Sequence, residues 1–255
     1  MWHVGALQKR ILISVVSGLS ALAVLLGAAI FTGRLIPNSG AAGAYPIRGV
    51  DVSHHQGTID WPVVALANVD FAYIKATEGG DLRDDQFANN WKNAAAYRIP
   101  RGAYHYFTFR TSGASQADNF LSTVPIDSSA LPPAVDLEFG GNASTHPSVS
   151  EFQRELTDFL SRLRHTYKKE PVVYTTVVYT TDDFYAQYLS DYPIKRLWIR
   201  STLYKPRLPP GHDWFLWQFT DRGHVRGIQT PVDLSVYYGN RAAFDAVTAE
   251  EQSNP

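Results

Sequence analysis

An uninterrupted apolar run lies near the start of the chain. Residues 11–31 (ILISVVSGLSALAVLLGAAIF) carry no charge, and their only hydroxyls belong to three serines. At about 1.5 Å per residue, a helix of this length spans roughly 30 Å, which matches the hydrocarbon core of a bilayer. Because Lys9 and Arg10 precede the run, we expect the amino terminus in the cytoplasm and the rest of the chain outside it. The pattern predicts a signal-anchor helix.

A cleaved signal peptide is the alternative interpretation of this run. Residues 42–44 (AGA) resemble a cleavage site, but the apolar run exceeds the roughly 7–15 residues of a signal-peptide core. We therefore expect a membrane-anchored protein, and a secreted one if the signal is cleaved. Residues 37–43 (PNSGAAG) predict a flexible linker. The expected organisation is residues 1–44 as a cytoplasmic stub, anchor helix and linker, followed by a folded domain over 45–255.

Beyond the linker, short apolar runs alternate with helical patterns. Eight strands are predicted, at residues 47–53, 71–77, 102–109, 134–139, 171–179, 196–200, 214–220 and 232–238. Apolar residues spaced three and four apart predict helices within 84–97, 115–124, 152–167 and 181–189, and Ser148 with Glu151 has the spacing of a capping box before the third. Because strands joined through helices pair in parallel, we predict an α/β, TIM-like barrel whose helix-free last part is irregular.

Composition narrows the class of protein. The 255 residues carry a net charge of −1, and 13% are aromatic, so the chain is neither disordered nor basic enough to indicate a nucleic-acid partner. The absence of cysteine excludes disulfides, thiolate metal sites and cysteine nucleophiles. The part beyond the linker is long enough for one packed core.

Acidic residues gather at the carboxyl ends of the predicted strands, where barrel enzymes keep their working residues. These ends hold Asp51, Glu78, His105, Asp136, Glu138, Trp217 with Gln218, and Asp233. Strand alternation places Asp136 and Glu138 on one face, with Cα atoms about 7 Å apart. Two crowded carboxylates do not both ionise readily, and an acid beside a carboxylate is what glycoside cleavage requires. The alternative is that one acid binds an arginine and the other is solvated.

The surrounding motifs resemble those of the glycoside hydrolase family 25 lysozymes, the Chalaropsis type. Six pieces occur in order: GVDVSHHQG at 49–57 followed by IDW at 59–61, IKATEG at 74–79, GAYHYF at 102–107, DLE at 136–138, WQF at 217–219 and VDL at 232–234. Each piece is weak alone, but six in register are specific. The resemblance implies a (β/α)5(β)3 barrel that needs no cofactor and cleaves the β-1,4 bond between N-acetylmuramic acid and N-acetylglucosamine in peptidoglycan.

Carried onto this sequence, the resemblance implies roles for four acids. Glu138 corresponds to the general acid and Asp136 to its catalytic partner, while Asp51 and Asp233 complete the acidic cluster. Two mechanisms stay open. Asp136 orients the substrate's own N-acetyl group for attack on the anomeric carbon, or a carboxylate such as Asp51 activates water and the product inverts.

Other residues are expected around the groove. Trp217 is a candidate for stacking on a sugar beside Gln218, with packing as its alternative role, whereas Trp198 is expected to pack in the core or at the rim. Tyr106 is expected to bind sugar or line the wall. Lys75 is expected to pair with an acid of the cluster, and Glu78 completes the substrate-binding set. Arg200 departs from the Trp-x-Ala-x-Tyr pattern common in the family and places a cation near the groove.

Two other function classes are considered. A catalytically silent wall-binding module would use the same groove, but it would not need the acid pair. A metal-dependent polysaccharide deacetylase would use His54, His55 or His105 with nearby acids. Adjacent histidines on a strand point to opposite faces, so no metal site is expected. We expect a monomer whose partners are peptidoglycan and, through the helix, the membrane.

Overall fold

The computed structural model describes residues 5–176, 184–208 and 213–249. Its strands are β1 (Arg48–Val52), β2 (Phe71–Glu78), β3 (Leu82–Arg83), β4 (Arg101–Tyr106), β5 (Ala134–Leu137), β6 (Val172–Thr176), β7 (Leu197–Arg200), β8 (Leu216–Gly223) and β9 (Val232–Tyr237). Its helices are α1 (Ala6–Phe31), α2 (Ser39–Ala42), α3 (Trp61–Val64), α4 (Phe87–Ala96), α5 (Gly113–Thr123), α6 (Val149–Tyr167) and α7 (Arg241–Thr248), with a 3-10 turn at His54–Gln56 and a π-helix at Tyr185–Leu189.

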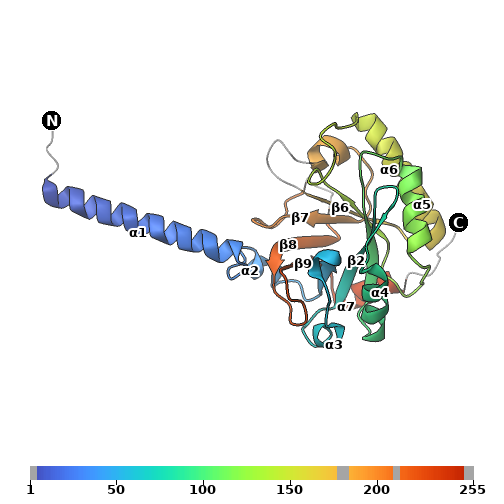
Figure 1. The fold of residues 1–255 in the computed structure, drawn as a ribbon, viewed down its shortest axis with the longest axis horizontal. Coiled ribbons are helices and arrows are strands. Elements are labelled where there is room, and N and C mark those ends of the chain that lie inside the picture. Colours follow the sequence, from blue (N-terminus) through green and yellow to red (C-terminus); the bar gives the residue numbers. More distant parts are fainter. Residues whose placement is uncertain (1–4, 177–183, 209–212, 250–255) are drawn as a thin grey trace.

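Eight of these strands form a closed barrel (Figure 1). β1, β2, β4, β5, β6, β7 and β8 pair in parallel in that order. β9 pairs antiparallel with both β8 and β1 and so closes the barrel. Helical segments follow the first five barrel strands, whereas the described residues between β7 and β9 contain none. The predicted irregular (β/α)5(β)3 barrel is confirmed.

The local elements follow the predicted patterns with a few differences. α6 begins as expected, because the Ser148 hydroxyl accepts a hydrogen bond from the backbone N–H of Glu151 at 3.3 Å. The predicted strand at 171–179 is β6 up to Thr176, and its remainder, like the start of the helix predicted at 181–189, falls outside the described residues. β3 and α7 were not predicted, since two residues and eight residues are too short for a clear periodicity.

Apolar side chains form separate layers inside and outside the barrel wall. On β5, Val135 and Leu137 point outward into the layer shared with α5 and α6, so Asp136 between them points inward. The interior near the amino ends of the parallel strands is filled by another cluster, which contains Phe71, Tyr73, Leu131, Ala134, Val172, Leu216, Tyr237 and Phe244. This plug closes one end of the barrel and leaves the carboxyl ends of the parallel strands for the site.

The expectation of a flexible linker over residues 37–43 is wrong. The outer wall of β7–β9 carries apolar side chains such as Ile199 and Trp217. Among the described residues no helix lies between these strands, and α7, which follows β9, packs against the other cluster through Phe244 and Val247. Two residues of the segment cover the wall: Ala42 is fully buried against it, and the Asn38 amide donates to the Ser201 carbonyl at 2.9 Å. Covering an apolar wall outweighs the turn-forming tendency of the sequence.

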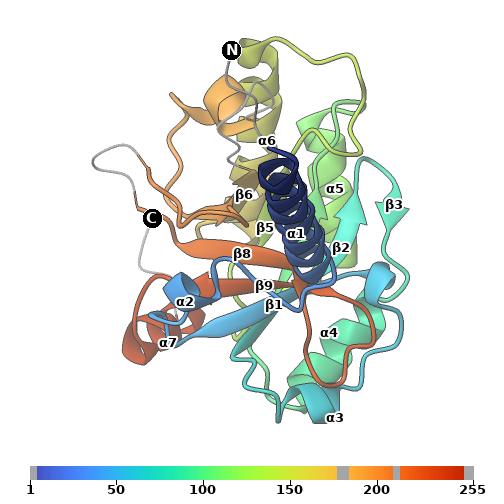
Figure 2. The ribbon, with the colours of Figure 1, turned by 90° about the vertical axis from the view of Figure 1, so that its left-hand side faces the viewer.

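The predicted anchor helix is α1, which extends away from the barrel (Figure 1). Figure 2 looks nearly along α1 onto the wall made by β8, β9 and β1. The stretch Gln8–Phe31 is long and apolar enough to cross a membrane, and none of its most apolar window is buried in the protein. At the end of α1, the Arg222 guanidinium lies over the ring of Phe31, the last helical residue, and the His224 Nε2 atom lies 3.1 Å from the Thr32 carbonyl oxygen.

Candidate active site

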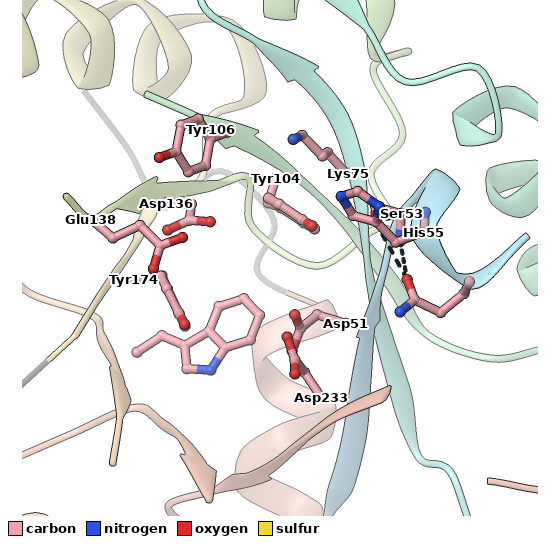
Figure 3. Close-up of a pocket in the computed structure, with 12 residues that line it drawn as sticks. Asp51, Ser53, His55, Lys75, Tyr104, Tyr106, Asp136, Glu138, Tyr174 and Asp233 are labelled. Atoms are coloured by element: carbon pink, nitrogen blue, oxygen red, sulfur yellow. Dashed lines mark hydrogen bonds between the residues drawn. The ribbon is translucent and has the colours of Figure 1, made fainter. Parts of the chain in front are cut away.

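A cavity of about 240 Å³ opens at the carboxyl ends of the parallel strands. Cross-strand register sets Tyr106, Asp136, Tyr174 and Trp198 side by side on β4, β5, β6 and β7. Figure 3 shows Asp136 and Glu138 on one side of the cavity and Asp51 with Asp233 on the other. The residues that line it are Asp51, Ser53, His55, Gln56, Lys75, Tyr104, Tyr106, Asp136, Glu138, Tyr174, Trp198 and Asp233. All four predicted acids therefore meet in one site.

Asp136 and Glu138 are partly buried, and the pKa of each carboxyl is raised. Burial raises the pKa of Asp136 well above its ordinary range, and the negative charge of Glu138 adds to the rise. Burial also raises the pKa of Glu138, while the positive charge of Arg200 opposes that rise. Burial, more than crowding by acids, is thus the main cause of the Glu138 shift. Among the described residues, the Oδ1 atom of Asp136 is buried without a hydrogen-bond partner. The cavity therefore holds two carboxyls close together in the sequence, both with raised pKa values.

Asp51 and Asp233 form a second pair of acids. They stand opposite each other in the β1–β9 ladder, and the Oδ2 atom of Asp51 is buried without a hydrogen-bond partner among the described residues. Burial and then the charge of Asp233 raise the pKa of Asp51 well above its ordinary range, and burial raises the pKa of Asp233 to about 6. Both carboxyls therefore keep their protons to a higher pH than an exposed aspartate does.

Two cations flank the acids, and each has a counter-ion outside the cavity lining. The Lys75 ammonium on β2 lies 2.7 Å from a Glu78 carboxylate oxygen and 5.1 Å from the centre of the Tyr106 ring. The Arg200 guanidinium on β7 lies 2.6 Å from a carboxylate oxygen of Asp221. The expected pairing of Lys75 with an acid of the cluster is wrong, since its partner is Glu78, which does not line the cavity.

Aromatic side chains form the floor of the cavity. Trp198 packs between Tyr73 and Tyr174, with ring centroids 4.9 and 5.0 Å away, and its indole N–H donates to the Ser235 hydroxyl at 3.0 Å. Trp198 therefore packs, as predicted, but it also lines the cavity. Tyr106 lines the wall and donates its hydroxyl proton to the Gly140 carbonyl. Tyr104 also lines the cavity and was not predicted to do so, although its position two residues before Tyr106 places it on the same strand face.

Trp217 and Gln218 do not line the cavity. Trp217 is fully buried on the outer wall, where it packs against Tyr45 and Trp214 and donates to the Ser201 carbonyl at 2.9 Å. Of the two predicted roles for Trp217, stacking on sugar is wrong and packing is correct. Gln218 points inward but is only 1% exposed, which is too little for direct sugar contact.

The histidines occupy separate environments. His54 and His55 lie in a 3-10 turn rather than a strand, with ring centroids 4.0 Å apart. The Nδ1 atom of His54 lies 2.7 Å from Asp84, whereas His55 faces the cavity. His105 is buried between Thr77 and Gln116, and burial lowers its pKa to about 3. Over the part of the chain described by the structure, no group of three or more potential ligands could hold a metal ion.

Fold and site together define a class of enzyme. A barrel that gathers four carboxyl groups around one cavity, two of them only two residues apart in the sequence, can donate a proton and stabilise positive charge in the same cavity. These are the chemical requirements of glycoside hydrolysis. Comparison with known proteins identifies the family within this class.

Residues 50–228 match the family described as Glycosyl hydrolases family 25. The chain is 33% identical to lysozyme M1 of Streptomyces globisporus over 218 residues, which cover 82% of this chain and 73% of that protein. A family 25 glycosyl hydrolase structure from Bacillus anthracis superimposes with a TM-score of 0.74 and 38% identity, over 80% of this chain and 94% of that one. A lysozyme structure from Streptomyces coelicolor gives a TM-score of 0.71 and 32% identity, over 80% and 97%. The chain belongs to glycoside hydrolase family 25 and is a glycosidase.

Proposed function

We propose that this protein is a peptidoglycan hydrolase that cleaves the β-1,4 bond between N-acetylmuramic acid and N-acetylglucosamine. The similar Streptomyces proteins are lysozymes, which supports the substrate class. The single observation that carries the proposal is the pair of Asp136 and Glu138 lining the cavity, in which the Asp136 Oδ1 atom has no hydrogen-bond partner among the described residues.

In this proposal, Glu138 donates a proton to the oxygen of the leaving sugar. Its raised pKa supports that role, because a carboxyl group must stay protonated near neutral pH to act as a general acid. The unpartnered Oδ1 atom of Asp136 accepts the N–H of the substrate's N-acetyl group, so that the acetyl oxygen attacks the anomeric carbon. Asp136 lies on β5 and Glu138 directly follows this strand. They act from one side of the cavity (Figure 3), which favours this route over direct attack by water.

The test uses the full chain in detergent and purified peptidoglycan, with mass spectrometry of the soluble fragments. The wild type should release fragments with reducing-end N-acetylmuramic acid. Glu138→Gln should lose about 100-fold or more of this activity with an unchanged melting temperature, whereas Glu151→Gln, an exposed control on α6, should retain it. Reducing-end N-acetylglucosamine would indicate a glucosaminidase, and binding to sacculi without fragments would indicate a wall-binding module.

Stereochemistry separates the two mechanisms. Substrate assistance predicts that the first product formed retains the anomeric configuration, because two displacements occur at the same carbon. Proton NMR during the first minutes of hydrolysis measures this directly. An inverted first product would contradict the role given to Asp136 and would favour water activated by a carboxylate such as Asp51.

We also propose that α1 stays attached and holds the barrel outside the cytoplasmic membrane. Cleavage after Ala44 would remove Asn38 and Ala42, which cover the outer wall of β7–β9. The uncleaved chain should therefore be recovered from the membrane fraction with its full mass and its amino terminus intact. A secreted product that begins at Tyr45 would contradict this localisation.

A further inference from the structure

Arg200 stands at the same height in the barrel wall as the proposed acid. Along β7, Trp198 faces the cavity and Ile199 faces the outer wall, so Arg200 faces inward again, one step closer to the open end. Arg200 is the register partner of Thr176 on β6. Leu137 on β5 is the partner of Thr175, so the next residue, Glu138, lies level with Thr176 and therefore with Arg200. Two strand spacings, about 10 Å, separate the two residues across the wall. A sugar whose anomeric carbon lies at Glu138 therefore has its substituents within reach of Arg200.

The Arg200 guanidinium is held in place but keeps donors free. One terminal nitrogen is bonded to Asp221 at 2.6 Å, and the side chain is 30% exposed. In the part of the chain that the structure describes, neither its Nε atom nor its other terminal nitrogen has a protein partner, and neither is a fully buried orphan. Lys75, the cation on the opposite side, lines the cavity, but it is only 10% exposed and is engaged by Glu78. Arg200 lies just beyond the cavity lining and is thus the flanking cation with the more accessible donors.

A planar guanidinium with free N–H groups is suited to a carboxylate, which it can bind through parallel hydrogen bonds. Neutral N-acetylglucosamine offers no such group. The muramoyl unit does: its lactyl ether ends in a carboxylate when the peptide is absent, and the stem peptide carries carboxylates when it is present. We propose that Arg200 is a specificity-determining residue that binds a carboxylate of the muramoyl unit. The inference rests on the proposed muramidase function.

Asp221 has a defined part in this arrangement. It fixes the side chain of Arg200 before substrate binds, and so reduces the rotamer entropy that binding would otherwise cost. It also neutralises the guanidinium in the free enzyme. A substrate carboxylate then adds hydrogen bonds from the free donors without displacing Asp221.

The experiment measures kcat/KM of the full chain on matched glycan strands. Peptide-free strands with free lactyl carboxylates are compared with the same strands after their carboxylates are converted to neutral methylamides. We expect the wild type to prefer the carboxylate strands by about 10-fold to 100-fold, the range for a hydrogen-bonded charged group. In Arg200→Gln the ratio should fall close to 1, with the loss mainly in KM. Arg226→Gln, which removes an exposed arginine from the β8–β9 loop, should keep the wild-type ratio.

Each outcome has a distinct meaning. The inference is overturned without any variant if the wild type shows no preference in either comparison. The first comparison is between free and neutralised carboxylates on peptide-free strands, and the second is between free and amidated stem carboxylates on peptide-bearing strands. A preference confined to peptide-bearing strands supports it and identifies the stem as the source of the carboxylate. An equal loss on both substrates in Arg200→Gln, with the ratio unchanged, overturns it and assigns Arg200 to the electrostatics of Glu138. Arg200→Lys keeps the positive charge but not the planar set of N–H donors, so it should show a preference for carboxylate strands between that of the wild type and that of Arg200→Gln. If no strand is cleaved by the wild type, the proposed function itself fails.

Discussion

The docking of residues 37–43 on the barrel gives a prediction that a thermodynamic cycle can measure. The buried Ser201 carbonyl accepts two hydrogen bonds of 2.9 Å, one from the Asn38 amide and one from the Trp217 indole N–H. Asn38→Leu or Trp217→Phe removes one of these bonds and leaves the carbonyl with the other. Each change should therefore lower the free energy of unfolding by about 1 kcal/mol.

The double variant should cost more than the sum of the single ones. It leaves the Ser201 carbonyl buried without a partner, and an unsatisfied buried acceptor costs about 1–3 kcal/mol. We expect a coupling energy of about 1 kcal/mol between the two sites. The assay is urea unfolding of the full chain in detergent micelles, followed by near-ultraviolet circular dichroism. Trp61, whose indole N–H donates to Asn90 at 3.1 Å on another side of the barrel, provides the control.

Asn38→Leu combined with Trp61→Phe should be additive within about 0.5 kcal/mol, because the sites share no partner. Zero coupling between Asn38 and Trp217, together with a neutral Asn38→Leu, would refute the docking and restore a flexible linker. Activity offers a second readout. Trp217→Phe should leave kcat/KM on peptidoglycan within about twofold of the wild type, since the side chain packs outside the cavity, and a large loss would restore its stacking role.

Two further predictions concern pH and packing. The positive charge of Lys75 lowers the pKa of Glu138, so Lys75→Met should raise that pKa. In a pH profile of kcat/KM, the alkaline limb, where the general acid loses its proton, should move to higher pH. An alkaline limb that stays in place or moves to lower pH would contradict this. Gly49→Ala would place a methyl group 2.2 Å from the Phe71 ring, so it should lower the free energy of unfolding by about 1–3 kcal/mol in the same urea assay. Gly140→Ala is the control, because the added methyl group meets no atom within 4 Å.

Much of the site could be predicted from local pattern. Alternation along one strand is enough to place Asp136 and Glu138 on a common face, because successive side chains of a strand point in opposite directions. The same rule failed for Trp217. The segment 214–220 gives no clear alternation, with apolar residues at most positions, so its phase could not be fixed. A phase error of one residue exchanges the inner and outer faces.

Other features depend on contacts between distant segments. Asp51 and Asp233 stand side by side only because β9 closes the barrel against β1 in one register. Arg200 keeps its position because the Asp221 carboxylate reaches it from β8. No local pattern encodes either pairing, since both follow from how the strands are ordered around the barrel.

The sequence by itself determined the order of strands and helices, the apolar helix and the acid pair, since these depend on periodicity and on residues close together in the chain. The tertiary structure alone decided which tryptophan lines the cavity, how burial sets the protonation of the acids, and that residues 37–43 are packed. The physical reason is common to all three. Burial is a property of the assembled barrel, in which the apolar wall of β7–β9 and the closed acidic cavity exist only after distant strands have paired.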